Sequence, residues 1–423
     1  MLHAKAKRVV PTADPDLIAV NNGIFDYKKK CMLPFSPDYV FMSKSRVDYN
    51  PNAKNVVIHN PSDNTDWDVE SWMNTLSDDP EIVAVLWEIL GAIIRPNVPW
   101  NISAWFFSET GNNGKGTLCE LMRQLCGEGS YCSISLKSMG KDFALEELVH
   151  SSAIITDENA VGVYIDDAAN LKAIITNDVL QINRKFKQAI TYRFRGFMVQ
   201  CLNEMPRIKD KSDSFFRRQL FIPFTKCFTG MERKYIKTDY LHRKEVLEYV
   251  MKRVLESDYY SLSVPAACVD ALEQYREYND PVRRFAMEVV AQMKWKLLPY
   301  TFLYDAYKAW YRQEEESGQI MGANAFRVQI RAVLAGNARY AIPDQRKKIR
   351  PRHYMDDLEP LIEEYDLKDW MNPYYAGSPD VDKRCKPVLR DYYRGIMVDG
   401  VQVEECEDEG SGDEGSGEQS QEE

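Results

Sequence analysis

Apolar and polar positions follow two different periods along the chain, and each change of period marks a segment. From residue 66 to 94 apolar residues recur at helical spacing. From 102 to 224 short, β-branched apolar runs alternate with helical segments, which is typical of a parallel or mixed sheet covered by helices. Helical spacing then returns, and the helices expected there are 234–255, 268–278, 282–293, 300–316 and 323–334. The pattern predicts an α/β core followed by an α-rich C-terminal region.

The two ends of the chain differ from its body in composition. Residues 1–60 are rich in Pro, Asn and Asp, and we interpret them as the remnant of a longer N-terminal module. Residues 404–423 hold ten acidic and no basic residues, so the net charge of −10 leaves a body that sums to zero. This tail cannot bury apolar surface and is expected to be disordered. Three roles stay open for it: solubilising the protein, competing with DNA for a basic groove, or docking a basic partner.

Length, cysteines and hydropathy limit the class of protein. A chain of 423 residues with 44% hydrophobic residues suggests two or three domains. Nine cysteines form no Cys-x-x-Cys pair and five histidines are scattered, so no zinc site is expected. No signal peptide is recognisable, which indicates a cytoplasmic location. The most apolar helix, 82–94, is too short to span a bilayer, and no membrane contact is expected.

A glycine-rich segment between the apolar run 102–107 and a helical segment is typical of a nucleotide phosphate loop. Glycines let backbone N–H groups close around phosphate oxygens, and a lysine neutralises the terminal phosphates. The pattern is imperfect, because Glu109 stands in place of its first glycine and a glycine follows the lysine. An ordinary glycine turn is the alternative. The candidate phosphate-binding residues are Gly111, Asn112, Asn113, Gly114, Lys115, Gly116 and Thr117.

Two carboxylates follow the next buried strand pattern, 151–156. At the end of a parallel strand, Asp157 would hold Mg²⁺ together with Thr117, and Glu158 would polarise the attacking water. The alternative is a core strand that runs into a solvated turn.

Further along, a strand pattern at 197–202 ends in Asn203, which can position water and sense the terminal phosphate. Arg217 and Arg218 precede another apolar strand, and one of them can act as an arginine finger on a neighbouring subunit. Two surface cations at a strand start are the alternative.

A β-hairpin with a basic, aromatic tip is predicted at 179–194. Residues 179–184 and 189–194 alternate like strands around the tip residues Lys185, Phe186 and Lys187. Lysines attract a phosphate chain without reading sequence, and an exposed phenylalanine offers a face for base stacking. A solvated turn with Phe186 packed inward is the alternative.

The order of these motifs resembles the superfamily 3 helicases, in particular the phage, plasmid and poxvirus primase-helicase family. The segments 22–26, 47–53, 171–178 and 302–326 are also similar to blocks of that family. The resemblance covers roughly 20–335 and implies an AAA+-like P-loop core, a winged-helix-like C-terminal domain, and a ring, as a hexamer, that binds ATP and Mg²⁺. It further implies 3′ to 5′ movement on single-stranded DNA inside a bacterial host.

The function that follows is an ATP-dependent replicative DNA helicase of a phage or mobile element, with no primase domain ahead of it. Its expected partners are single-stranded DNA, forked or origin duplex DNA, further copies of the chain, and a separate primase or replication protein. Two alternatives stay open: an ATP-dependent origin-recognition or helicase-loading switch, and a non-enzymatic DNA-binding scaffold.

The expected division of the chain combines these segments. It comprises the N-terminal remnant 1–60, a helical lead-in 61–100, the ATPase core 101–258, the winged-helix-like domain 262–340, an extension 341–403 and the tail 404–423. A basic stretch near the end of the body either contacts duplex phosphates or is a solvated face. Its members are Arg327, Arg331, Arg346, Lys347, Lys348, Arg350 and Arg352.

Overall fold

The computed structural model describes residues 10–60, 63–141, 143–314, 320–344, 346–375 and 377–399. The acidic tail at 404–423 lies outside these residues. The chain divides into two compact units, Met1–Asn279 and Asp280–Glu423, which we call unit 1 and unit 2. Within the described residues no helix combines the length and apolar character needed to cross a membrane.

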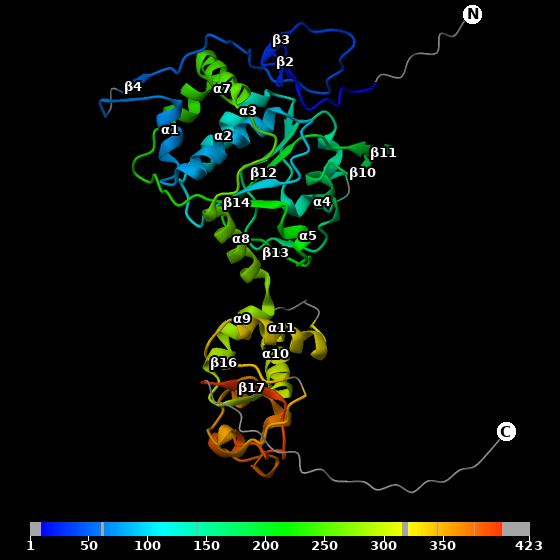
Figure 1. Cartoon of the computed structure of the whole chain (residues 1–423), viewed down its shortest axis with the longest axis vertical. Helices are drawn as coiled ribbons and strands as arrows, with labels where there is room; N and C mark the ends of the chain where they lie inside the picture. Colours follow the sequence, from blue (N-terminus) through cyan, green and yellow to red (C-terminus); the bar gives the residue numbers. More distant parts are fainter. Residues whose placement is uncertain are drawn as a thin grey trace, which may run out of the picture. The chain divides into compact units, whose positions relative to one another are not determined.

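Unit 1 is built on a five-stranded sheet in which every neighbouring pair of strands is parallel (Figure 1). The strand order is β14–β6–β12–β8–β7, with bounds Gln219–Pro223, Ser103–Phe107, Phe197–Leu202, Ala153–Thr156 and Tyr131–Cys132. The prediction of an α/β core with a parallel sheet is therefore confirmed. The strands read as continuous apolar runs because helices cover both faces of the sheet.

Successive residues of each strand point to opposite faces, so the sheet separates two cores. Phe106 and Val199 pack in the first core with α2 (Pro80–Ile94), α3 (Lys115–Cys126) and α7 (Lys244–Glu256). Trp105 and Met198 pack in the second, with α4 (Ala169–Ile175) and α8 (Ala266–Asn279). These helices lie on opposite sides of the sheet in Figure 1.

The N-terminal residues add small elements to the first core. They form a three-stranded antiparallel sheet and a hairpin, followed by a short helix. Tyr27 connects this region to the end of unit 1, where its hydroxyl accepts from the backbone N–H of Tyr259 at 3.1 Å. The bounds are β1 Leu17–Val20, β2 Gly23–Asp26, β3 Cys31–Leu33, β4 Ile58–Asn60, β5 Thr65–Trp67 and α1 Val69–Thr75.

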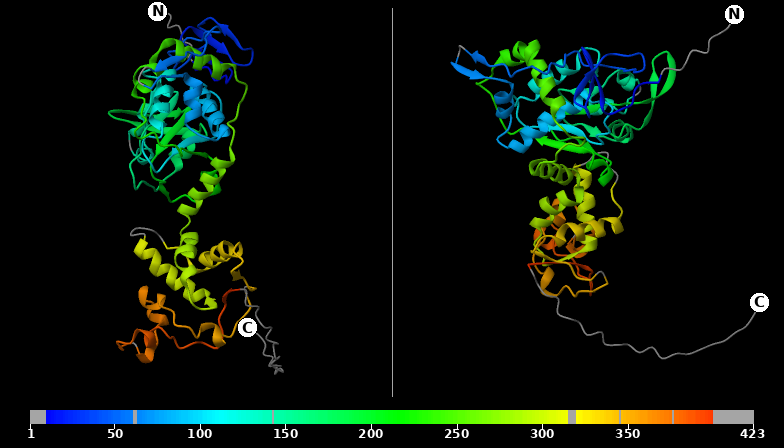
Figure 2. Two further views of the ribbon diagram at one scale, coloured as in Figure 1. Left: turned by 90° about the vertical axis from the view of Figure 1, so that its left-hand side faces the viewer. Right: turned by 45° about the horizontal axis from the view of Figure 1, so that its top comes forward.

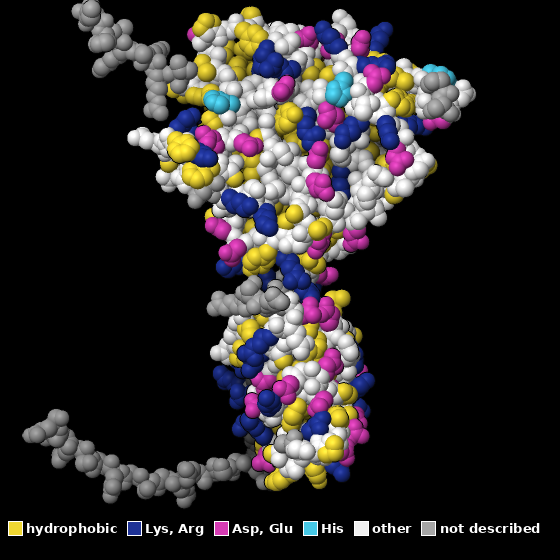
Figure 3. Space-filling view, turned by 180° about the vertical axis from the view of Figure 1, so that it is seen from behind, with side chains coloured by type: hydrophobic (Ala, Val, Ile, Leu, Met, Phe, Trp, Pro, Cys, Tyr) yellow, Lys and Arg dark blue, Asp and Glu magenta, His cyan; other side chains and the backbone are white. Residues whose placement is uncertain are grey.

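The remaining elements of unit 1 add residues to both cores, since Leu180 and Phe215 pack in the second core and Ile236 packs in the first. They are β9 Tyr164–Ile165, β10 Val179–Arg184, β11 Lys187–Arg193, β13 Arg207–Ile208, α5 Asp213–Phe216 and α6 Lys234–Thr238. The β10–β11 hairpin projects from the body of unit 1 in each ribbon view (Figures 1 and 2). Over the face shown in Figure 3, basic and acidic side chains are interspersed, in keeping with the zero charge sum of the chain without its tail.

Helix α8 belongs to unit 1, although the sequence analysis had assigned its residues to the winged-helix-like domain, 262–340. Its Tyr275 is fully buried and packs against Trp105 at 5.8 Å and Phe221 at 4.5 Å between ring centroids. The sequence pattern of an amphipathic helix does not say which core its apolar side enters. The aromatic contacts assign this helix to the second face of the sheet.

Unit 2 combines helices with a three-stranded antiparallel sheet of order β15–β17–β16. The helix expected at 282–293 ends at Glu288 and continues only as a 3₁₀ turn, Val290–Gln292. Trp295, Phe302 and Trp370 pack together in its core. The bounds are α9 Pro281–Glu288, β15 Leu297–Pro299, α10 Tyr300–Glu314, α11 Ala323–Ala335, β16 Tyr340–Ala341, α12 Leu361–Glu364, α13 Val381–Arg384 and β17 Gly395–Val398.

Candidate functional site

The glycine-rich loop joins the end of β6 to the first turn of α3. Gly114 caps the helix with a φ of 88°, and a Cβ atom there would lie 2.5 Å from Cδ2 of Leu76. Only glycine can adopt this positive φ and also leave room for the Leu76 side chain without strain. The loop is held from outside by a later segment, because the Phe228 N–H donates to the Asn112 carbonyl at 2.7 Å. Glu232 accepts from Nδ2 of Asn112 at 3.2 Å.

Lys115 begins α3 and turns its side chain into the edge of the sheet. It is 5% exposed, and its ammonium donates to the Leu202 carbonyl at 2.9 Å and to Oδ1 of Asn203 at 3.0 Å. A third, longer bond of 3.4 Å reaches the Ser108 carbonyl. Burial lowers the pKa of this lysine. The structure thus brings together the lysine of the loop and the asparagine that follows β12.

Asp157 and Glu158 follow β8, the strand beside β12. Gln200 of β12 pairs with Thr156 of β8 in parallel register, so both strands end at the same edge. The Asp157 carboxylate pairs with Arg123 of α3, the helix that Lys115 begins. Glu158 is exposed. Helix α3 therefore contributes to the surroundings of both the lysine and the first carboxylate.

Sequence reasoning missed Asn159, which fixes this edge of the sheet. Asn159 is 5% exposed, and its Nδ2 donates to Oε1 of Gln200 at 2.9 Å and to the Cys201 carbonyl at 3.1 Å. Its Oδ1 accepts from the Leu136 N–H at 2.9 Å. An Asp-Glu-Asn sequence after a strand is indistinguishable from a solvated turn, so no signal in the chain reveals this role. The sequence likewise gives no signal that Arg123 pairs with Asp157.

The two candidate finger arginines have different surroundings. Arg217 follows α5 and is exposed. Arg218 folds back on the same helix, where its Nη1 donates to Oγ of Ser214 at 3.0 Å and to the Ser214 carbonyl. Of the two arginines, Arg217 is the exposed one, and the role of either as a finger stays a prediction.

The predicted hairpin is present, with its second strand starting at Lys187 rather than 189. Arg184 pairs with Lys187, which leaves Lys185 and Phe186 as a two-residue turn. The Phe186 side chain is 95% exposed, its φ is 58°, and the Lys185 ammonium lies 5.4 Å from its ring centroid. The alternative with Phe186 packed inward is wrong. The backbone of Phe186 is therefore strained, and burial of its ring does not compensate for that strain. Backbone strain of this kind clusters at functional positions.

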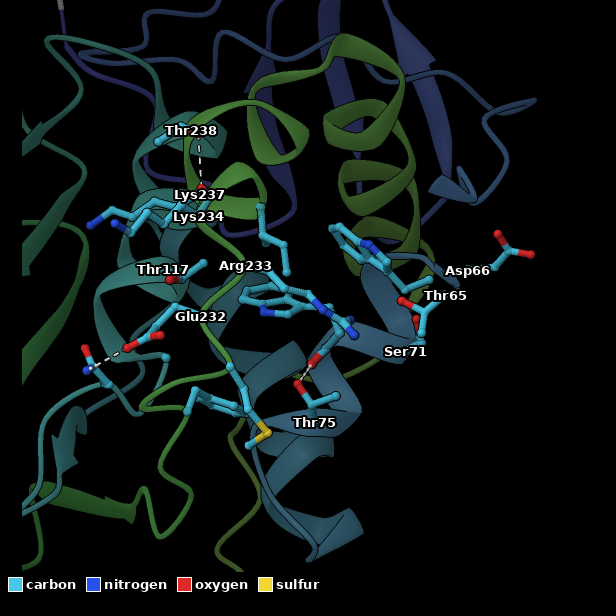
Figure 4. A pocket seen from close by; sticks show the side chains of 17 residues that line it. Thr65, Asp66, Ser71, Thr75, Thr117, Glu232, Arg233, Lys234, Lys237 and Thr238 are labelled. Atoms are coloured by element: carbon cyan, nitrogen blue, oxygen red, sulfur yellow. Dashed lines mark hydrogen bonds between the residues drawn. The ribbon is translucent and has the colours of Figure 1, made fainter. Parts of the chain in front are cut away.

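A cavity of about 690 Å³ adjoins the loop. Asn112, Gly114 and Thr117 line it, while Asp157 and Glu158 are not among its described lining residues. Figure 4 shows Thr117 and Glu232 on one side and Ser71 and Thr75 of α1 on the other. Sequence reasoning did not find this cavity, because its walls come from three segments far apart in the chain.

Lys237 of α6 also lines the cavity and is a second cation near the loop that the sequence analysis missed. Its Nζ lies 3.6 Å from the place that a Cβ atom on Gly116 would take. Because Gly116 has no side chain, the Lys237 ammonium can lie close to the first turn of α3. The spacing of Lys237 from the loop gives no hint of the contact.

Three family models match the chain in order. Residues 10–78 match the D5 N terminal like family, 106–218 a family of unknown function (DUF5906), and 277–360 the Poxvirus D5 protein-like family. By its D5-type matches the chain is similar to phage and viral helicases of the primase-helicase family. The resemblance to the primase-helicase family is thereby confirmed, and the first and last matches lie on either side of the loop and strand motifs.

Solved structures similar to this helicase-like chain include the apo C-terminal region of NrS-1. One such structure is 14% identical, covers 85% of this chain and 80% of its own, and has a TM-score of 0.42. A second form is 16% identical over 78% and 71%, with a TM-score of 0.41. A JCV helicase with a bound small molecule is 16% identical over 52% and 60%, with a TM-score of 0.32. The family assignment depends on the ordered sequence matches.

Proposed function

We propose that this chain is an ATP-dependent replicative DNA helicase, with an AAA+-like P-loop core, that hydrolyses ATP at subunit interfaces of a ring. The observation that carries the proposal is the buried Lys115 ammonium, which joins the glycine loop to Asn203 at the strand edge shared with Asp157. A terminal phosphate placed at this edge would meet the lysine, the backbone N–H groups of the first turn of α3 and the dipole of a 12-residue helix.

Each residue of the edge has a role in this proposal. Lys115 binds the β and γ phosphates, Glu158 orients the attacking water, and Asn203 exchanges its bond to Lys115 for one to the water or the phosphate. Proton transfer to a positioned carboxylate contributes about 10² to 10⁴ in rate. Glu158 is exposed, so its side chain is open to water in the nucleotide-free protein.

The residues present fit a magnesium ion. No group of three or more His, Cys, Asp or Glu side chains within the described part of the chain forms a self-contained metal site. Mg²⁺ bound with a nucleotide needs only one or two protein oxygens besides phosphates and water, and the Asp157 carboxylate would provide one of them. Thr117, the other predicted ligand, lines the cavity beside the loop, and Asp157 is not among the described lining residues of that cavity. The ion would neutralise the developing charge on the phosphates.

DNA contacts are proposed for two elements. The hairpin tip offers Lys185 and Lys187 to the phosphate chain and the Phe186 ring to a base. In unit 2 the chain order is α9, β15, α10, α11 and β16, followed after α12 and α13 by β17. Together with the sheet order β15–β17–β16, this order supports a winged-helix-like domain. Two of its arginines are already engaged: Arg331 donates to the Tyr300 hydroxyl at 2.6 Å and Arg350 to the Tyr392 hydroxyl at 2.7 Å.

The test is an ATPase assay with and without single-stranded DNA, combined with mass measurement of the assembly in nucleotide. We expect hydrolysis that DNA stimulates, and a closed ring, as a hexamer, when nucleotide is bound. Unwinding of a forked substrate separates a helicase from a loading switch, which would hydrolyse ATP without displacing the strand. Absence of hydrolysis under all conditions would refute the proposal.

A further inference from the structure

Arg123 lies in the third turn of α3, and its guanidinium joins two carboxylates. Its Nη1 donates to Oε2 of Glu120 at 3.2 Å, and its Nη2 pairs with Oδ1 of Asp157. The Arg123 side chain is 17% exposed, so the guanidinium is largely enclosed between these partners. One helix therefore carries both the lysine that is proposed to bind phosphates and an arginine that holds the first carboxylate after β8.

The pair with Arg123 engages only one side of the Asp157 carboxylate. Oδ1 is buried, whereas the Asp157 side chain as a whole is 37% exposed. Oδ2 is the oxygen that this pair leaves for a ligand. An ion pair that solvent reaches contributes little to folding stability, so the main consequence of this pair is the direction that it gives to the carboxylate.

Glu120 fixes the guanidinium from its other end. Its Oε1 accepts from Nε2 of Gln124 at 2.8 Å and lies 3.4 Å from Nε2 of His242. With one oxygen bound by Gln124 and the other by Arg123, this carboxylate is fixed as well. In formal charges, one guanidinium faces two carboxylates, so the cluster keeps a negative charge that suits a divalent cation.

We propose that Arg123 is a positioning residue of the hydrolytic site, which holds Oδ1 of Asp157 so that Oδ2 is presented to the metal ion bound with the nucleotide. The inference rests on the proposed function and adds to it a residue that none of the sequence motifs includes. Partners that orient a metal ligand from behind raise metal affinity, and their loss typically costs about 10- to 100-fold. Arginine suits this task better than lysine, because its planar fork bonds two carboxylates at once.

The experiment separates metal binding from nucleotide binding. Arg123→Gln removes the charge, and Arg123→Lys keeps the charge but loses the fork. Mn²⁺ replaces Mg²⁺, and its affinity for the ADP-bound protein is measured from the EPR signal of the free ion. The affinity for ADP in EDTA is measured separately, by fluorescence polarisation with a labelled ADP.

Arg253→Gln is the matched control, because it removes an arginine with similar contacts elsewhere in unit 1. Arg253 of α7 donates to Oε1 of Glu70 at 2.8 Å, and its guanidinium carbon lies 4.2 Å from the Trp87 ring centroid. Neither Arg253 nor Glu70 has a role in the proposed chemistry. The control protein should therefore bind both Mn²⁺ and ADP as the wild type does.

Arg123→Gln should weaken Mn²⁺ binding by about 10- to 100-fold and leave ADP binding in EDTA unchanged. Its ATPase should need correspondingly more Mg²⁺ for half-maximal rate, with an unchanged KM for ATP once Mg²⁺ saturates. Arg123→Lys should lie between this variant and the wild type, and it decides alone if Arg123→Gln does not fold. Wild-type Mn²⁺ affinity in Arg123→Lys, an equal loss in Arg253→Gln, or loss of ADP binding in EDTA would overturn the proposal.

Metal binding measured without turnover keeps this inference separate from the proposed function. If no ATP is hydrolysed but Mn²⁺ binding to the ADP complex still weakens in the Arg123 variants, the helicase proposal fails and the role of Arg123 stands. If ATP is hydrolysed but the Mn²⁺ affinity is the same in all of these proteins, only the inference about Arg123 fails.

Discussion

At the scale of single residues, the candidate site depends on a charge that is buried yet fully bonded. The Lys115 ammonium has three oxygen acceptors, and the nearby Asp157 carboxylate has Arg123. Burying a charge is costly unless it is paired and hydrogen-bonded, and the buried Lys115 ammonium meets that condition through its three acceptors. Glu158 is different, because its carboxylate is exposed and free to meet water.

Glu158→Gln and Lys115→Ala should both remove ATP hydrolysis, but for different reasons. The glutamine preserves size and exposure, so we expect kcat to fall by about 10² to 10⁴ with nucleotide binding retained. The alanine removes the cation that binds the phosphates, and nucleotide binding should be lost as well. Steady-state ATPase kinetics and ADP binding measure the two effects.

The control for these substitutions is Glu128→Gln, an exposed glutamate just beyond the far end of α3. It should have wild-type kinetics. Normal turnover by the Glu158→Gln protein would contradict the role assigned to that carboxylate.

At the scale of elements, the β10–β11 hairpin combines backbone strain with an unburied aromatic ring. Phe186 has a φ of 58° and is 95% exposed, so its native contacts do not compensate for the left-handed backbone. Phe186→Gly should leave the free energy of unfolding unchanged or slightly higher. It should weaken single-stranded DNA binding by the equivalent of about 1 to 3 kcal/mol, the range for loss of one stacked base.

Urea unfolding and fluorescence anisotropy with labelled DNA measure the two effects. Lys187→Ala should keep basal ATP hydrolysis and lose its stimulation by DNA. The matched control for Phe186→Gly is Phe35→Ala, which removes a half-exposed phenylalanine elsewhere in unit 1. A Phe186→Gly protein with full DNA affinity would show that the ring does not stack on a base.

Unit 2 contains a buried carboxylate whose titration should make its stability depend on pH. Glu359 is 0% exposed and accepts from the Lys294 N–H at 2.7 Å, and burial raises the pKa of its carboxyl group. A raised pKa in the folded state means that protonation favours folding. Stability contributed by this group is therefore present below the ordinary glutamate pKa and is lost as pH rises through the folded-state value.

Glu359→Gln should remove this dependence. We expect the stability of the variant relative to the wild type to increase as pH rises from the ordinary glutamate value through the raised one. Amide hydrogen exchange of β15 in the two full-length proteins, followed across that pH range, measures this difference in stability. A constant difference between the two proteins at all pH values would count against a raised pKa.

At the scale of the whole molecule, the proposed ring makes a site shared between subunits. Lys115 and Glu158 belong to one subunit's site in this proposal, while the exposed Arg217 would act on its neighbour's nucleotide. Arginine fingers contribute about 10³ to 10⁵ in rate in other NTPases. Loss of Arg217 should therefore be almost as severe as loss of Lys115.

Mixing inactive proteins tests this arrangement. Lys115→Ala and Arg217→Ala proteins are each expected to be inactive, and co-assembly should restore hydrolysis at about a quarter of the interfaces by random assortment. A mixture of Lys115→Ala with Glu158→Gln should recover nothing, because both residues act within one subunit. Equal behaviour of the two mixtures would contradict a finger in trans.

The sequence by itself determined the elements of the core and the local chemistry that they carry. Continuous apolar runs, alternating apolar positions and helical spacing are imposed by burial within each element. The parallel-sheet strands, the hairpin at 179–194 and the glycine required at 114 could therefore be predicted from local residues. The order of the motifs was enough to suggest the family. These features depend on contacts that lie close together along the chain.

Only the tertiary structure decided which distant side chains meet. Nothing in the local sequence shows that Arg123 reaches Asp157, that Lys237 lies beside Gly116, or that α1 and residues 228–238 enclose a cavity. It also decided that α8 packs on the sheet and that Arg218, unlike Arg217, bonds its own helix. Such pairings are set by how helices cross the sheet, and residue spacing along the chain does not encode that geometry.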